Sequence, residues 1–182
     1  MSLDLLSVPP LAESRIWEGV VIHHSATVDG KTYDTASIKA YHMSYKYEGH
    51  AIEKGKAEML IAKGVDGIVH PWVDIGYNWC IEKVDGMVRL FPGRKLTMDG
   101  AHAKGFNETH LGICVIGNFD LAAPEDVMFE SALELVRHLI KEFPFTRYDV
   151  LGHRETYGLR SVAVEKTCPG NYFDMDKFRR EI

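Results

Sequence analysis

Several features that assign proteins to common classes are missing from this chain. Its 182 residues include only three cysteines, no long uninterrupted apolar run and no block of basic residues. Without a run of about eighteen apolar residues, no membrane-spanning helix is expected. With 21 basic and 26 acidic side chains the chain is mildly acidic, so nucleic acid is not an expected partner. Three cysteines also give no paired disulfide framework.

The N-terminus carries neither the basic region nor the apolar region of a secretory signal. We therefore expect no signal peptide in this chain and synthesis in the cytoplasm. The sequence contains no internal repeat, low-complexity tract or linker, and its length suits one hydrophobic core. These observations predict a single domain covering residues 1–182.

Apolar patterning predicts alternating strands and helices. Strands are expected at 17–23, 75–82, 87–91, 111–117 and 149–153, with Val84, Asp85 and Gly86 forming a hairpin turn. Helices are expected after Asp34, with Ile38, Tyr41 and Tyr45 on one face, and at 57–63, 124–143 and 174–178. The fold class predicted is α/β, with a central mixed β-sheet flanked by helices.

Three polar side chains stand at positions that suit metal ligands. His23 and His153 each follow a strand-like run, and Cys168 lies about fifteen residues further on in a polar Lys166-to-Gly170 loop. Two imidazoles and a thiolate occupy three corners of a zinc tetrahedron and leave the fourth for water. Adjacent strand residues face opposite ways, so only one of His23 and His24 should reach the metal. The predicted site therefore lies at one end of the sheet and holds Zn²⁺.

Six strings occur in a characteristic order along the chain: IHHSAT, DIGYNW, GAHAKGFN, LGICVIGNFD, GHRE and KTCPG. With this ordered set the chain resembles the zinc-dependent N-acetylmuramoyl-L-alanine amidases of the amidase-2 and peptidoglycan-recognition-protein superfamily. The resemblance runs from about Val20 to the C-terminus and is interrupted by one insertion at about 48–72. Cys80 and Cys114, in apolar runs, are expected to be buried hydrophobes instead of ligands.

The resemblance implies roles for individual side chains. His23, His153 and Cys168 match the family's zinc ligands. Tyr77 matches its active-site tyrosine, and Lys166 matches the catalytic lysine of the bacteriophage branch. In addition, His102 and Asn107 match a substrate-binding groove motif.

The function expected is hydrolysis of the bond between N-acetylmuramic acid and L-alanine in peptidoglycan or muropeptides. Two alternatives stay open: a non-catalytic peptidoglycan-recognition module and a cytosolic muropeptide-recycling amidase. A bacterial or phage-encoded monomer that acts on the cell wall, with a prophage endolysin as the first candidate, is expected. The insertion is expected to form one wall of the groove and, from its Met59, Leu60 and Ile61 run, to pack down onto the domain.

Overall fold

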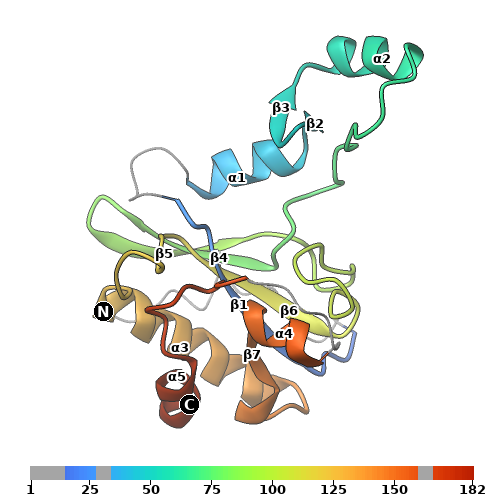
Figure 1. Cartoon of the computed structure of the whole chain (residues 1–182). Helices are drawn as coiled ribbons and strands as arrows, with labels where there is room; N and C mark the ends of the chain where they lie inside the picture. The colour runs from blue at the N-terminus through green and yellow to red at the C-terminus, as the bar shows by residue number, and fades with distance from the viewer. Residues whose placement is uncertain (1–14, 28–33, 160–165) are drawn as a thin grey trace.

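A five-stranded mixed sheet forms the centre of the computed structural model, which describes residues 15–27, 34–159 and 166–182. The strands follow the order β5-β4-β6-β1-β7. Their bounds are Gly19–His24 for β1, Trp79–Val84 for β4, Met87–Pro92 for β5, His110–Val115 for β6 and Val150–Gly152 for β7. Strands β4, β6, β1 and β7 run parallel to one another, and β5 pairs antiparallel with β4. The predicted α/β class with a mixed sheet is confirmed (Figure 1).

One face of the sheet is closed by helix α3, Asp126–Glu142. The apolar stripe of α3 buries Leu135 and Leu139 against strand residues such as Ile22, Ile81 and Ile113, all fully buried. Helix α5, Met175–Glu181, begins after Asp174, which accepts a hydrogen bond from the Lys177 backbone, and it adds Phe178 to this core. The short 3-10 helix η3, Arg147–Asp149, leads into β7. We call this side the core face.

The opposite side, here called the site face, is covered more lightly. A small cluster of Ile75, Cys80, Cys114 and Ile116 packs there against Ile38 of helix α1, Thr35–His42. The buried Glu82 carboxylate accepts hydrogen bonds from the Thr35 amide (3.0 Å) and hydroxyl (2.8 Å), so β4 holds the start of α1. Cys80 and Cys114 are free thiols in this apolar cluster, in agreement with the sequence expectation.

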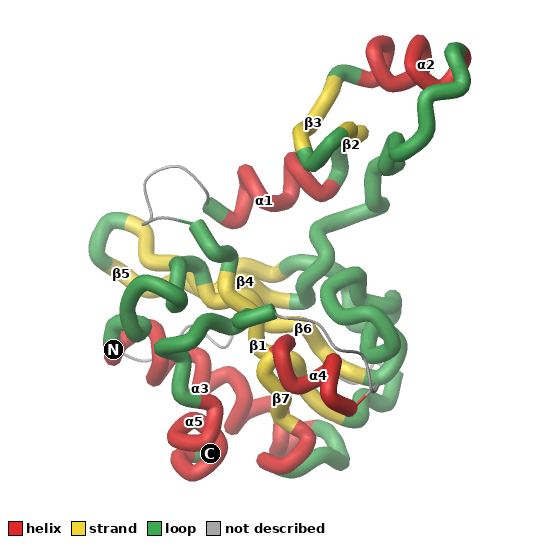
Figure 2. Tube along the Cα trace, in the orientation of Figure 1, coloured by secondary structure: helices red, strands yellow, loops and turns green. Residues whose placement is uncertain are grey.

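Between α1 and β4 the chain forms a projecting arm, defined here as residues 45–72 (Figure 1). It contains the antiparallel pair β2, Tyr45–Tyr47, and β3, His50–Ile52, followed by helix α2, Lys54–Ala62. Figure 2 shows that the return from α2 to β4 is mostly loop.

Two expectations about this region were wrong. Tyr45 begins β2 and is not on the first helix. The arm does not pack down onto the domain, since Met59 is 48% and Ile61 43% exposed and Ala57 is the buried residue of α2. The contacts that hold the arm are at its base, where the Lys46 ammonium donates to the Tyr41, His42 and Ser44 carbonyls at the end of α1.

The last predicted strand also needs correction. It was expected to run to His153, but β7 ends at Gly152 and His153 begins helix α4, His153–Leu159. The Glu155 carboxylate accepts a hydrogen bond from the Gly152 amide (2.6 Å), which stabilises this first turn. Within the described ranges, none of the helices has the length and apolar character needed to cross a bilayer.

Candidate metal centre

The two candidate histidine ligands lie where neighbouring parallel strands end. His23 is near the carboxyl end of β1, and His153 directly follows β7, its partner in the sheet. Cys168 approaches them from the loop that precedes α5. One ligand atom from each of the three residues lies within 4.8 Å of the other two. The fold therefore brings together three side chains of types that can bind a metal and that are up to 145 residues apart in sequence.

His24, the neighbour of His23, points to the other side of the sheet. Its Nδ1 accepts a hydrogen bond from the Phe119 amide (3.1 Å), and its Nε2 lies 3.9 Å from Asp120. The alternation of side chains along a strand accounts for this separation. His24 is only 6% exposed but does not join the cluster of His23, His153 and Cys168.

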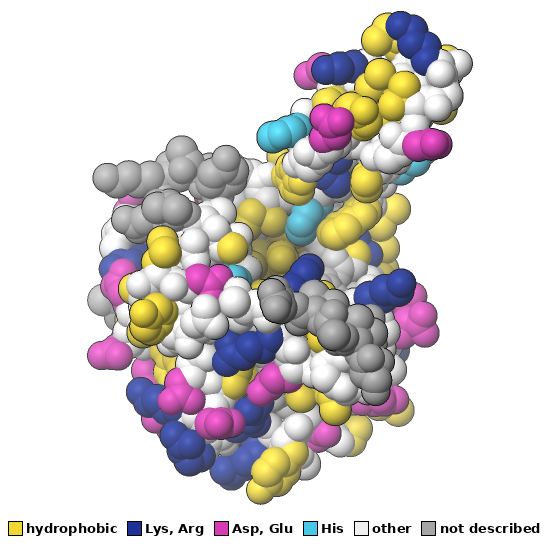
Figure 3. Space-filling model, in the orientation of Figure 1, with side chains coloured by type: hydrophobic (Ala, Val, Ile, Leu, Met, Phe, Trp, Pro, Cys, Tyr) yellow, Lys and Arg dark blue, Asp and Glu magenta, His cyan; other side chains and the backbone are white. Residues whose placement is uncertain are grey.

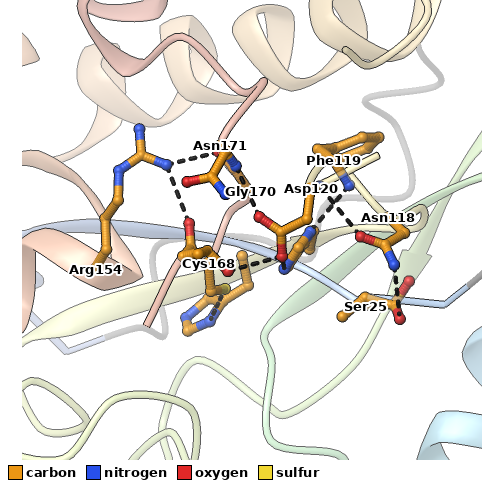
Figure 4. Close-up of polar contacts among 12 residues, drawn as sticks. Ser25, Asn118, Phe119, Asp120, Arg154, Cys168, Gly170 and Asn171 are labelled. Atoms are coloured by element: carbon orange, nitrogen blue, oxygen red, sulfur yellow. Dashed lines mark hydrogen bonds and ion pairs between the residues drawn. The ribbon is translucent and has the colours of Figure 1, made fainter. Parts of the chain in front are cut away.

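Two charged side chains hold the Cys168 loop from opposite sides (Figure 4). The Arg154 amide donates to the Cys168 carbonyl (2.7 Å), and its guanidinium donates to the carbonyls of Thr167 (3.1 Å) and Gly170 (2.7 Å). On the other side, Asp120 accepts from the Thr167 hydroxyl (2.7 Å) and the Asn171 amide (2.9 Å). Because Arg154 directly follows the candidate ligand His153, the same short segment positions both His153 and Cys168.

Gly170 is required at its place in this loop. Its φ is +112°, and a Cβ there would lie 2.4 Å from the carbonyl carbon of Phe119. A residue with a Cβ would therefore push this loop away from Phe119. This close approach explains a glycine two positions after the thiol.

Burial controls the protonation of the cluster. Desolvation, followed by the nearby His102 and His153, holds the pKa of His23 well below its usual value. Burial raises the pKa of the Cys168 thiol to about 11, although a backbone hydrogen bond from His24 and the positive charge of Lys166 act in the other direction. A bound cation would favour the neutral imidazole and the thiolate, which are the ligand forms of these groups.

Tyr77 and Lys166 flank the cluster. The Tyr77 ring lies 5.1 Å from the His23 ring, and burial, together with the nearby thiols of Cys114 and Cys168, raises its pKa well above the usual value. Lys166 is exposed, and its ammonium lies 5.8 Å from the centre of the Tyr157 ring. The structure therefore offers a neutral phenol on one side of the cluster and a cation near the other.

His102 and Asn107 lie in the loop between β5 and β6. His102 contacts the cluster through His23, with 3.0 Å between its Nδ1 and His23 Nε2. The Asn107 side-chain oxygen accepts hydrogen bonds from the backbone amides of His102 (2.8 Å) and Ala103 (2.9 Å). The contacts of Asn107 thus organise the loop that carries His102.

Sequence reasoning missed three residues that shape the centre. Tyr157 places its hydroxyl 3.4 Å from His153 Nε2, and Arg154 and Asp120 hold the Cys168 loop. Arg154 and Asp120 do stand in the GHRE and LGICVIGNFD strings. Their position inside these strings was a signal that could have identified them as site residues. Tyr157 lies outside the strings, so there was no such signal for it.

The fold and the cluster define a class: an α/β domain whose mixed sheet carries a two-histidine, one-cysteine site at the ends of its parallel strands. The chain belongs to the N-acetylmuramoyl-L-alanine amidase family, whose sequence model matches residues 13–171. The ordered strings thus led to the correct superfamily.

Individual relatives include phage and animal proteins. The endolysin of Klebsiella phage KP32 is 29% identical over 110 residues, which are 59% of this chain and 65% of that protein. Peptidoglycan-recognition protein LB of Drosophila melanogaster is 29% identical over 152 residues, which are 83% of this chain and 53% of that protein. The chain thus spans between about half and two thirds of these curated relatives.

Solved structures show the same fold. The endolysin amidase LysCS from Clostridium intestinale URNW superposes with a TM-score of 0.60 at 25% identity, covering 91% of this chain and 82% of that chain. A mutant of Drosophila PGRP-LB in complex with tracheal cytotoxin gives a TM-score of 0.58 at 24% identity, covering 88% and 79%.

Proposed function

We propose that the chain is a zinc-dependent amide hydrolase that cleaves between N-acetylmuramic acid and L-alanine in peptidoglycan or muropeptides. The observation that carries this proposal is the convergence of His23, His153 and Cys168, with ligand atoms within 4.8 Å of one another, in a member of the amidase family. Three protein ligands are typical of a catalytic zinc, because the fourth position stays open.

The donor set fits zinc. Cys168 Sγ and His23 Nδ1 are 3.7 Å apart, close to the separation of about 3.5 Å between sulfur and nitrogen ligands of one tetrahedral zinc. The pairing of a thiolate with two imidazoles favours zinc over magnesium or calcium, which prefer oxygen ligands. When bound, zinc supplies Lewis acidity that polarises a carbonyl and activates water.

Tyr77 would act as a hydrogen-bond donor. Its raised pKa keeps the phenol protonated at neutral pH, and its ring lies beside His23. A neutral phenol beside His23 would donate to the oxygen that becomes negative as the amide carbonyl is attacked. Preorganised donors of this kind stabilise a transition state because they need no reorganisation during the reaction.

Lys166 would supply positive charge near the same oxygen. It lies two residues before Cys168 in the same loop, and its charge contributes to the lowered pKa of His23, so the two groups interact electrostatically. An ammonium near the developing oxyanion lowers the barrier without binding the ground state more tightly.

The substrate would lie along the site face beneath the arm. Figure 3 shows a hollow between the arm and the rest of the domain, with a histidine and apolar side chains along it. Here His102 and Asn107 were expected to contact substrate, and their loop borders the cluster through the contact between His102 and His23. The arm would form one wall of this hollow and influence which stem peptide fits.

Two alternatives have different chemical requirements. A recognition module binds muropeptide without cleavage and generally lacks the cysteine ligand, but this chain retains Cys168 beside both histidines. A cytosolic recycling amidase of this superfamily uses an aspartate as third ligand, which again disagrees with Cys168. The donor set therefore favours the hydrolase.

The proposed setting is the bacterial cell wall, with the chain encoded by a phage or its bacterial host and acting as a monomer. Relatives that are named endolysins support this setting.

Digestion of purified peptidoglycan tests the proposal. Mass spectrometry should detect newly freed L-alanyl amino termini with the parent protein and none with Cys168→Ser. If the parent binds the wall without freeing such termini, the recognition module is correct. Cleavage restricted to soluble anhydromuropeptides would instead identify a recycling amidase.

A further inference from the structure

The ring of His102 occupies a slot made by two glycines. A Cβ added at Gly112 of β6 or at Gly100 would lie 2.5 Å from His102 Cδ2. The imidazole therefore fits only because both positions lack a side chain. From this slot it meets the His23 ring edge-on, with centroids 5.0 Å apart and an interplanar angle of 84°. Such close accommodation implies that the orientation of His102 is tightly fixed.

The hydrogen bonds of His102 have a defined direction. Its Nε2 lies 3.1 Å from the His110 carbonyl oxygen, which can only accept, so Nε2 carries a proton. In a neutral imidazole the other nitrogen, Nδ1, is then an acceptor. His102 Nδ1 is 3.0 Å from His23 Nε2, so His23 Nε2 donates the hydrogen bond.

This direction determines which His23 nitrogen can bind a cation. With the proton on Nε2, the lone pair is on Nδ1, the nitrogen that lies 3.7 Å from Cys168 Sγ. We propose that His102 is a positioning residue that fixes the tautomer and ring orientation of His23, so that Nδ1 is presented to the metal. The inference rests on the proposed zinc site. It assigns His102 to the support of a ligand instead of to substrate contact.

The internal contacts of the loop agree with this role. Both ring nitrogens of His102 have protein partners, and its backbone amide is held by Asn107. His102 thus has no ring nitrogen left for a muropeptide while these bonds persist. Residues that hydrogen-bond a metal-ligating histidine typically change metal affinity by about 10–100-fold when replaced.

Two replacements test the roles of the two ring nitrogens of His102 separately. In His102→Asn the amide oxygen can take the place of Nδ1 and accept from His23, whereas in His102→Gln the amide nitrogen can take the place of Nε2 and donate to the His110 carbonyl. Zinc affinity, measured by competition with a chromophoric chelator, should stay near the parental value in His102→Asn. It should fall by about 10–100-fold in His102→Gln. His70→Gln, on the exposed arm, is the matched control and should bind as the parent does.

Histidine nitrogen NMR of the zinc-free parent provides a second readout that needs no variant. The inference predicts that His23 is protonated at Nε2; protonation at Nδ1 overturns it. Unchanged zinc affinity in both His102 variants, or an equal loss in both, also overturns it. These results leave the proposed function standing if the parent binds zinc. A parent that binds no zinc contradicts the proposed function, while the NMR result still decides the tautomer.

Discussion

The two faces of the central sheet are built by different rules. On the core face, β1, β4 and β6 present apolar side chains to α3, and residues such as Ile22 and Leu135 are completely buried. On the site face the same strands present His23 and two thiols to a light cover of α1 and loops. Adjacent residues of one strand, His23 and His24, belong to different faces.

This difference indicates that the core face mainly determines stability and that the site face mainly determines the chemistry. The core face excludes water by contiguous apolar packing, which supplies most of the stability of such a domain. The site face relies on directional contacts from loops, such as those of Arg154 and Asp120 to the Cys168 loop. Changes on the site face should therefore affect metal and turnover more than folding, and changes on the core face should do the reverse.

Removal of two of the proposed ligands should have the largest effect. The variant with His153→Ala and Cys168→Ser loses two of three donors, so it should purify without zinc and show only background hydrolysis. Elemental analysis measures the zinc content, and a peptidoglycan assay measures the hydrolysis. Cys80→Ala, which removes a buried thiol outside the cluster, should keep close to one zinc per chain. Full zinc in the double variant would contradict the assignment of the ligands.

A core-face truncation should show the opposite pattern. Leu135→Ala leaves a cavity against the sheet and should lower the free energy of unfolding by about 2–5 kcal/mol. At a temperature where the variant is folded, its zinc content should equal that of the parent. Denaturant unfolding measures the free energy of unfolding, and elemental analysis measures the zinc content. Loss of zinc in the folded variant would show that the two faces are not independent.

Loss of the proposed catalytic groups should affect turnover alone. Tyr77→Phe and Lys166→Ala should each lower kcat by about a hundredfold, because each removes an interaction made mainly in the transition state. Zinc content and substrate affinity should change little. Tyr148→Phe, at a tyrosine that is 80% exposed, is the matched control. A variant that retains the parental rate would exclude that residue from catalysis.

Shortening of the arm should have the smallest effect. Replacing residues 49–66 by a tight Gly-containing loop leaves the backbone pair between Lys46 and Val69 in place, whose N–O distances are 3.0 and 2.8 Å. Zinc content should be unchanged, and the ratio of rates on muramoyl-tripeptide and cross-linked wall should shift. If both rates match the parent, the arm does not influence substrate choice.

The sequence could predict the core face because apolar periodicity encodes it. The apolar stripe of α3 is a local signal for that helix. The turn residues Asp85 and Gly86, which both have positive φ, are a local signal for the β4–β5 hairpin. Strands β2 and β3 have three residues each and give too little periodicity to recognise. The arm was misjudged because apolar composition does not show whether a covering surface exists.

The residues of the site could be predicted from the sequence only where they lie in the ordered strings. They pointed to the side chains that meet in the cluster, but the contact between His23 and His102 joins residues 79 positions apart. Its direction depends on the His110 carbonyl, which no side-chain pattern reveals. Likewise, a helix starting at His153 could not be separated from the end of a strand by such a short run.

Zinc binding by two single variants tests the central claim most directly, because His23 and His24 are adjacent but lie on different faces. Zinc content and affinity should be measured for His23→Ala and His24→Ala, with circular dichroism to verify folding. The account predicts that His23→Ala loses most of its zinc and that His24→Ala retains close to one zinc per chain. The reverse result, with zinc kept in His23→Ala and lost in folded His24→Ala, would contradict it.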